Sequence, residues 1–213
     1  MAMEGTHIRF ARDLLAQSLL SVTDLTAYYS GAVYPDSRYV TGIPRSQTHE
    51  NQCPQDPFMS GLTDFEKGWA THLVYDVLAS IEKRTALATI PNEYREDDWA
   101  FHSAIKLVED QQSVLLLGSD TQILQTLILT ERPRNEDLEK MVQYYQNLRE
   151  AYGSNGTFED YHATSLKWGM PRTRVDRLIE LSKIFSEDPA VVEVIRLIYP
   201  TVFNRYVLRS IHT

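Results

Sequence analysis

The stretch from residue 61 to residue 84 constrains the fold most, because it predicts a helix that is apolar on nearly every side. Thr63 is placed to cap its start, and the acidic residues that follow suit the positive end of the helix dipole. A helix with so little polar surface is typical of the interior of a bundle. We therefore predict that Trp69 and Leu73 are buried and that other helices pack around this one.

Along this predicted helix, Gly68, His72 and Asp76 recur at a spacing of four residues and so share one face. An ionised aspartate in a buried position is costly unless a cation or strong donors meet it. Either His72 hydrogen-bonds Asp76, or both side chains bind a metal ion. Gly68 has no side chain, and we expect it to leave room for a ligand or a water above the pair.

The rest of the sequence predicts an all-α protein, a helical bundle of seven to nine helices in one domain over residues 1–213. Strand patterns are nearly absent, and 213 residues is a usual size for a single domain. Apolar residues make up 43% and charged residues 23%, as in soluble globular proteins. With no recognisable signal peptide and no membrane-spanning apolar run, we expect a cytoplasmic protein.

Charge and cysteine content exclude several classes of function. The net charge of −8 argues against general nucleic-acid binding and against an anionic membrane surface. Cys53 is the only cysteine, so the chain has no internal disulfide and no thiolate metal cluster.

Helix boundaries follow from capping residues and prolines. Thr6 is expected to cap the first helix, and a second one over residues 22–32 is expected to end before Pro35. Pro200 should kink or interrupt the last helix. Other helices are expected to begin at Asn135, at Thr157 with Asp160 as its capping partner, at Pro171 and at Pro189.

Two further helices are predicted between residues 93 and 129. Residues 93–110 carry a polar stripe at a spacing of four, which we interpret as a ladder of solvated ion pairs. Residues 114–129 are predicted to be a core helix that begins at Ser119 or Asp120. The ladder in residues 93–110 consists of Asp98, His102, Lys106 and Asp110. Farther along the chain, His162 is expected at the surface or half-buried.

Residues 36–60 are predicted to be a long functional loop, because they contain several prolines and no sustained period. Asp36 and His49 are candidate metal ligands in this segment. Arg38 and Arg45 are candidate phosphate-binding residues, since a guanidinium offers paired donors to an anion.

Together with the helical pair, these residues make five candidate metal ligands in the first 76 positions. Imidazole and carboxylate side chains suit zinc, with manganese and iron as alternatives. Taken singly, each residue has an ordinary explanation, such as a helix start, a turn or a solvated loop. We predict that they converge at one end of the bundle. The candidate ligands are His7, Asp36, His49, His72 and Asp76.

The order of these residues resembles the zinc-dependent phospholipase C family, whose relatives include the fungal single-strand nucleases. The resemblance covers about the first eighty residues: His7, then GAVYPD ending in Asp36, THE with His49, and GWATHLVYD with His72 and Asp76. It implies an all-helical phosphodiesterase with clustered zinc ions, in which the residue matching Asp76 bridges two ions and the residue matching Asp36 lies at the reacting water.

The sequence departs from that family in its third metal subsite. Glu82 stands where the family has a further histidine, and His102 is followed four residues later by Lys106, where the family has glutamate. The family's amino-terminal ligand has no clear equivalent before His7. The resemblance therefore implies a site for one or two metal ions.

Three hypotheses for function follow. The first is a metal-dependent hydrolase of a small or lipid-like phosphate ester, with Asp36 orienting or deprotonating the attacking water. The second is an HD-type phosphohydrolase, which needs an adjacent His-Asp dipeptide that this sequence lacks. The third is a metal-free helical protein that binds a partner and uses His72 and Asp76 as a structural pair. The sequence leaves the substrate and the oligomeric state open.

Overall fold

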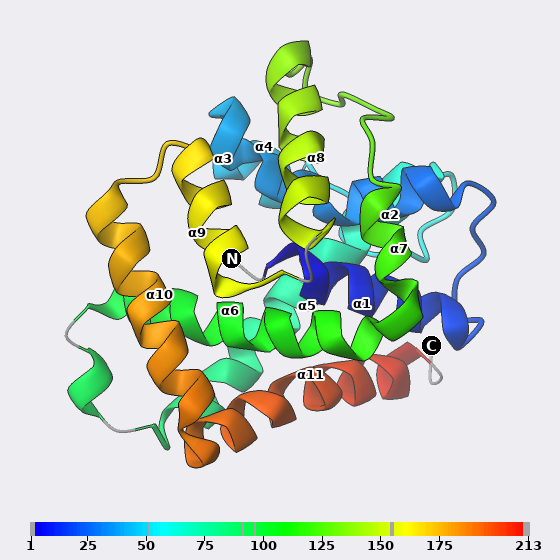
Figure 1. Ribbon diagram of the computed structural model, residues 1–213. Helices are drawn as coiled ribbons and strands as arrows, with labels where there is room; N and C mark the ends of the chain where they lie inside the picture. Colours follow the sequence, from blue (N-terminus) through cyan, green and yellow to red (C-terminus); the bar gives the residue numbers. More distant parts are fainter. Residues whose placement is uncertain (1–2, 51, 91, 96, 154–155, 211–213) are drawn as a thin grey trace.

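The computed structural model describes residues 3–50, 52–90, 92–95, 97–153 and 156–210, and this part of the chain is helical without any strand (Figure 1). Within these described ranges, eight α-helices have nine or more residues, which confirms the predicted all-α fold with seven to nine helices. The longer helices are α1 (Glu4–Ala16), α2 (Leu25–Val33), α5 (Asp64–Leu87), α6 (Asp98–Leu117), α8 (Leu138–Gly153), α9 (Phe158–Lys167), α10 (Arg172–Glu187) and α11 (Pro189–Ser210). The short elements are η1 (Tyr34–Ser37), α3 (Arg38–Thr41), α4 (Arg45–His49), η2 (Asn92–Arg95), η3 (Gly118–Thr121) and α7 (Gln122–Gln125).

Helix α5 is central, as predicted, and packs against α1, α2 and α11. The Thr63 hydroxyl accepts a hydrogen bond from the Glu66 amide at 3.2 Å, and the Glu66 carboxylate accepts one from the Thr63 amide at 2.9 Å. These reciprocal bonds satisfy amides that a helix start leaves without partners. Trp69 and Leu73 are buried. Farther along, Val77 is 58% exposed, so the second half of α5 is not enclosed on every side.

Helices α2 and α5 cross at two glycines, Gly31 and Gly68. A Cβ atom on Gly68 would lie 1.9 Å from the carbonyl oxygen of Tyr28, and one on Gly31 would lie 2.0 Å from that of Phe65. The backbones therefore touch with no side chain between them. The prediction that Gly68 leaves room for a ligand is wrong, because the α2 backbone fills that space. This contact brings the end of α2 against the first half of α5.

Helix α6 runs across the molecule in Figure 1, between α8 and α9 on one side and α11 on the other. It packs against α1, α10 and α11. It begins later than predicted, because the Asp97 carboxylate accepts a hydrogen bond from the Ala100 amide at 3.0 Å and caps the helix there. It ends at Gly118, whose φ of 55° is unfavourable for other residues.

The predicted core helix over residues 114–129 is wrong. Its first four residues belong to the end of α6, and Ser119 and Asp120 lie in η3 rather than at the start of a long helix. Only the short helix α7 follows before α8. The apolar tract is divided at Gly118, which allows Leu117 and Leu124 to be buried from different elements.

Two predicted caps are also wrong. Thr6 lies inside α1, whose N-cap is Met3, and Asn135 precedes α8 without capping it. The Asp137 carboxylate instead accepts a hydrogen bond from the Lys140 amide at 2.9 Å. Asn135 has a φ of 54°, so it serves as a turn residue.

The predicted starts of the last three helices, α9, α10 and α11, are confirmed. Thr157 and Asp160 form the predicted capping box of α9, and α10 begins directly after Pro171. Helix α11 begins at Pro189 as predicted. Pro200 does not interrupt it, since the helix continues to Ser210.

The segment 36–60, predicted to be a loop, contains two short helices, α3 and α4. The Trp69 indole donates a hydrogen bond of 2.8 Å to the Thr48 carbonyl. Arg134 donates to the carbonyls of Gln47 and Gln52 at 3.1 and 3.0 Å. These bonds hold the segment against the bundle and fix the position of the helix end at His49.

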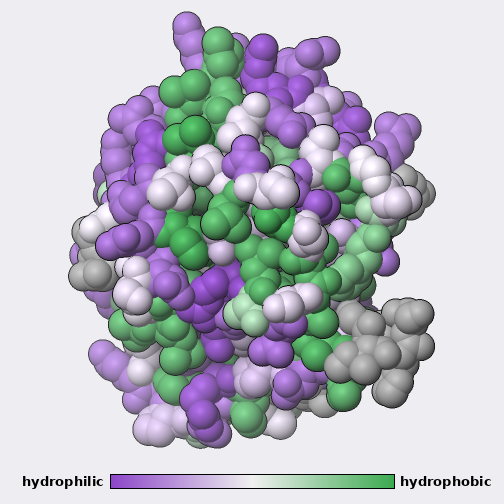
Figure 2. Space-filling view, turned by 90° about the vertical axis from the view of Figure 1, so that its right-hand side faces the viewer, coloured by the Kyte–Doolittle hydropathy of each residue, from purple (hydrophilic) through white to green (hydrophobic). Residues whose placement is uncertain are grey.

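No helix in the described part of the chain is both long enough and apolar enough to span a membrane. On the face shown in Figure 2, apolar and polar side chains are interspersed. Exposed large apolar residues of the molecule include Leu25, Ile128 and Leu197.

Candidate functional site

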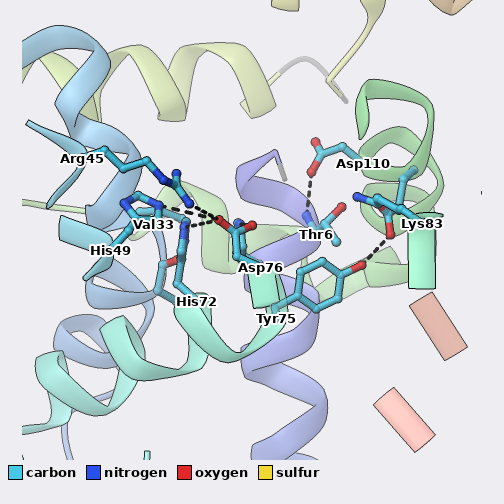
Figure 3. Close-up of polar contacts among 12 residues, drawn as sticks. Thr6, Val33, Arg45, His49, His72, Tyr75, Asp76, Lys83 and Asp110 are labelled. Atoms are coloured by element: carbon cyan, nitrogen blue, oxygen red, sulfur yellow. Dashed lines mark hydrogen bonds and ion pairs between the residues drawn. The ribbon is translucent and has the colours of Figure 1, made fainter. Parts of the chain in front are cut away.

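The five predicted ligands come together in the structure from four elements. Figure 3 shows three of them, His49, His72 and Asp76, side by side. His7 comes from α1, Asp36 from η1 and His49 from the end of α4, and His72 and Asp76 lie one turn apart on α5. His7, Asp36 and His72 are almost fully buried. Two overlapping sets of three residues have potential ligand atoms within 4.8 Å of one another. They are His7, His72 and Asp76, and Asp36, His49 and His72.

Asp76 stands between the three imidazoles. Its Oδ2 lies 3.6 Å from Nε2 of His49 and 3.7 Å from Nε2 of His72, and its Oδ1 lies 3.7 Å from Nε2 of His7. These separations exceed the usual length of a hydrogen bond. Two ligand atoms about 2.1 Å from a tetrahedral zinc ion would be about 3.4 Å apart. The spacing therefore fits atoms that share an ion better than atoms that share a proton.

The ring nitrogens that face this point have no hydrogen-bond partner among the described residues. Nδ1 of His72 lies 2.9 Å from the Ala32 carbonyl, which can only accept, so Nδ1 carries the proton. In its neutral form, the His72 ring presents the Nε2 lone pair toward Asp76. Nδ1 of His49, the nitrogen that faces away from this point, is hydrogen-bonded to the Thr48 hydroxyl at 2.8 Å.

His7 and His72 stack with ring centroids 3.6 Å apart and planes 14° apart, an arrangement that two positive rings would disfavour. Burial, followed by His72, holds the pKa of His7 well below its usual value. Burial, followed by His72, lowers the pKa of His49 to about 3. Both rings are therefore neutral near pH 7, which is the form that binds a metal ion.

The two carboxylates of the site differ in their electrostatics. Burial favours the neutral form of Asp76, but His72, His7 and His49 together bring its pKa below the usual value. Burial raises the pKa of Asp36 to about 6 in spite of His72. Within the described chain, Oδ2 of Asp36 is buried and makes no hydrogen bond.

Of the two predicted phosphate-binding arginines, only Arg45 reaches the cluster. Its Nη2 lies 4.0 Å from Oδ2 of Asp76, and half of its side chain is exposed. Arg38 lies over the ring of its neighbour Tyr39, with the guanidinium carbon 3.9 Å from the ring centroid. Arg38 is near enough to Asp36 to lower the pKa of that residue, but it does not line the cavity beside Asp76.

Two lysines near Asp76 were not predicted as site residues. Lys83 is buried on α5, and its Nζ lies 2.6 Å from Oε2 of Glu109. Lys83 and Lys106 line a cavity of about 220 Å³ together with Arg45 and Asp76. The spacing of seven residues from Asp76 to Lys83 is two helical turns and was a usable signal. Lys106 carried no such signal, because its helix comes from another part of the chain.

A second buried carboxylate, Asp110, corrects the predicted solvated ladder. It is fully buried on α6 and accepts hydrogen bonds from the Thr6 amide at 2.6 Å, from the Tyr152 hydroxyl at 2.9 Å and from the Tyr161 hydroxyl. The exposed part of the ladder is as predicted, since His102 lies 3.3 Å from Asp98 at the surface.

His162 is half-buried, as predicted, and lies on α9 away from the cluster. Its Nε2 is 2.7 Å from a carboxylate oxygen of Asp176. This pair gives a histidine with an ordinary surface partner against which the cluster can be compared.

Comparison with protein-family models, with curated proteins and with solved structures gave no match. The fold and the geometry of the cluster are therefore the basis for the functional argument.

Proposed function

We propose that this chain is a metal-dependent hydrolase of phosphate esters. A divalent metal ion would be held by Asp36, His49, His72 and Asp76. His7 would complete the site from the other side of Asp76, because its Nε2 faces Oδ1 of that residue. One observation carries the proposal: buried ring nitrogens without hydrogen-bond partners face a carboxylate at 3.6–3.7 Å, a separation typical of ligands that share an ion.

The chemistry of the donor set favours zinc, with manganese or iron as alternatives, because it combines imidazole with carboxylate and lacks thiolate. The hydrogen bond from His72 to the Ala32 carbonyl orients the ring as second-sphere partners do in metal sites. The order of the ligands along the chain also resembles that of the zinc-dependent phospholipase C family, which supports the same class of reaction.

A bound divalent ion would supply a Lewis acid that polarises the phosphoryl oxygen and acidifies water. Asp36 is suited to orient the attacking water and to accept its proton, because its Oδ2 is buried and without a hydrogen-bond partner among the described residues. Arg45 would donate to a phosphoryl oxygen from the solvent side of Asp76. The protein's net charge of −8 favours a small or lipid-like ester over a long polyanion.

The decisive experiment is elemental analysis of the protein purified without a chelator. We expect at least one equivalent of zinc, manganese or iron in the wild type and a large loss in His72→Ala. The matched control is His162→Ala, which removes a histidine that pairs with Asp176 outside the cluster. Wild-type protein that binds no divalent ion after incubation with zinc would refute the metal site.

Turnover is then measured with chromogenic phosphomonoesters and phosphodiesters. A metal-loaded protein that hydrolyses neither would favour the alternative of a metal-free or metal-stabilised binding protein with a structural His-Asp pair. The specific observation behind that alternative is that His72 and Asp76 lie one turn apart on α5 with Nε2 and Oδ2 3.7 Å apart, so that a small movement would join them in a hydrogen bond with the ring protonated. The HD-type alternative is disfavoured, because no histidine in the sequence is followed directly by aspartate.

A further inference from the structure

The cavity beside Asp76 is lined mainly by cationic and polar side chains. Arg45, Ser80, Lys83 and Lys106 surround a space of about 220 Å³ that reaches Asp76. In Figure 3, Asp76 lies between Arg45 and Lys83. The walls come from three helices, α4, α5 and α6, so the cationic groups surround the space from different elements.

The charges of these side chains are not all neutralised by the protein. Lys83 is paired with Glu109 at 2.6 Å, and Glu109 also accepts a hydrogen bond from the Tyr75 hydroxyl. Lys106 is half-buried and makes no hydrogen bond or ion pair within the described chain; burial lowers its pKa, and the nearby carboxylate of Glu109 opposes that shift. Among the described residues, the one ion pair of the Arg45 side chain is the 4.0 Å contact with Asp76. Lys106 therefore lacks an ion pair within the described chain, and the carboxylate partner of Arg45 is at 4.0 Å. A half-buried ammonium without a close partner is costly.

A second cavity, of about 310 Å³, adjoins the first, because Lys106 lines both. Its other walls include the rings of Tyr39 and Trp99. Small-molecule pockets usually measure about 300–1,000 Å³ and combine apolar walls with a few well-placed polar groups. The two cavities together reach that size, but their walls are more polar than usual. The first carries the charged groups beside Asp76, and the second combines the Tyr39 and Trp99 rings with polar side chains that include Asp98.

We infer that Arg45, Lys83 and Lys106 form a binding pocket for the dianionic phosphate of a phosphomonoester, and that the organic part of the ester lies between Tyr39 and Trp99. Lys106, which has no ion pair within the described chain, and Arg45, whose one ion pair there is long, offer two positive charges to the ligand. Two cations match the two charges of a monoester phosphate better than the single charge of a diester. This assignment gives the substrate class of the proposed hydrolase. Hydrolysis of the bound ester therefore rests on the proposed function, whereas binding of the phosphate does not.

The first test is the affinity for inorganic phosphate, measured by isothermal titration calorimetry on zinc-treated protein and on protein kept in a chelator. Lys106→Met keeps the apolar stem and removes the charge, and we expect the Kd to rise by about 10- to 100-fold, as for the loss of a charge-assisted hydrogen bond. Lys106→Arg should keep the wild-type Kd within about threefold. Lys140→Met is the matched control, because Lys140 is exposed on α8 and lines neither cavity.

The second test separates monoester from diester. Phenylphosphonate, which resembles a phosphomonoester and cannot be hydrolysed at phosphorus, should bind at least tenfold more tightly than diphenyl phosphate. Trp99→Leu should weaken phenylphosphonate but leave inorganic phosphate unchanged, because only the first ligand has a ring to place in the second cavity. Equal binding of the two phenyl compounds would overturn the assignment of a dianion.

The outcomes separate this inference from the proposed function. Metal content is measured independently on every variant, and Lys106→Met should retain the wild-type amount. If the protein binds no metal but its phosphate binding depends on Lys106, the hydrolase proposal fails while the pocket stands. If wild-type protein binds no phosphate in either form, or if Lys106→Met binds it as tightly as wild type, the pocket is refuted.

Discussion

Asp76 and Asp110 are both surrounded by protein, yet their neighbours differ in kind. Asp110 receives hydrogen bonds from the Thr6 amide and from the hydroxyls of Tyr152 and Tyr161. Asp76 is faced by three imidazole nitrogens at 3.6–3.7 Å, none of which makes a hydrogen bond in the part of the chain that the structure describes. The protein thus surrounds one carboxylate with hydrogen-bond donors and faces the other with imidazole nitrogens that have no hydrogen-bond partner among the described residues.

This difference distinguishes a structural carboxylate from a ligand. A buried carboxylate that is met by donors is complete without any other group, and its removal leaves those donors without an acceptor. A carboxylate that shares a space with bare nitrogen lone pairs is complete only when a cation joins them. The same residue type in two buried places therefore predicts opposite responses to metal and to substitution.

The largest expected effect is on turnover, in the Asp36→Asn variant. If Asp36 accepts a proton from the attacking water, the amide should lower kcat by about 10²- to 10⁴-fold, the usual contribution of a general base. Metal content should remain near the wild-type level, because an amide oxygen still faces the site. Steady-state kinetics with elemental analysis of the same samples checks this, and unchanged kcat would remove Asp36 from the mechanism.

The Asp110→Ala variant should lose stability without losing metal. Three donors would be left buried without an acceptor at a cost of about 1–3 kcal/mol each, partly relieved by relaxation, so we expect a loss of about 3–5 kcal/mol in the free energy of unfolding. Urea denaturation gives this value. A variant that unfolds normally but no longer binds zinc would show that the two regions are not independent.

Added zinc should stabilise the wild type and the Asp110→Asn variant but not Asp76→Asn. At a free zinc concentration 100-fold above the Kd, linkage gives about 2.7 kcal/mol. For a protein of this size, that amounts to roughly 5–10 °C in Tm. Differential scanning fluorimetry with zinc and with a chelator measures the shift. An equal shift in Asp76→Asn would place the ion elsewhere.

The smallest expected effect is the pH dependence contributed by Asp110. Burial raises the pKa of Asp110 to about 6, above the value of about 3.9 expected in the unfolded chain. A raised pKa means that the fold holds the proton more tightly, so this stability is present at low pH and is lost as the pH rises through 6. Between pH 5 and pH 7 the loss should be about 1 kcal/mol.

The Asp110→Asn variant should lack that component of the pH dependence. The comparison with wild type is needed because burial also raises the pKa values of Glu4 and Asp36, which act in the same direction. Urea denaturation of both proteins at pH 5 and pH 7 gives the difference. A steeper loss of stability in the variant would contradict the assignment.

The sequence predicts the surroundings of Asp76 better than those of Asp110. His72 and Asp76 could be placed on one face because a helix fixes which residues are neighbours. Asp110 stands four residues after Lys106, and this local pattern is the same in a solvated ladder and in a buried helix. Its donors lie between 42 and 104 residues away in the chain, so spacing carried no information about them.

Local sequence patterns are limited in the same way for the fold: they place single helices but not the contacts between them. The central position of α5 and the start of α11 follow from local apolarity and from Pro189, and both were predictable. The role of Gly68 was not, since a missing side chain indicates a close approach without saying what approaches. The sequence equally predicted a ligand there, whereas the neighbour is the α2 backbone.

The contact between the backbones at Gly31 and Gly68 has a consequence for motion. Side chains between helices can change rotamer and absorb a small displacement, but this crossing has none, so a shift of α2 displaces α5 directly. The Ala32 carbonyl, which fixes the His72 ring, is one residue from Gly31. Ligand binding at His72 should therefore slow amide hydrogen exchange around this crossing more than in α8 or α9, and opening of the crossing should release the ligand.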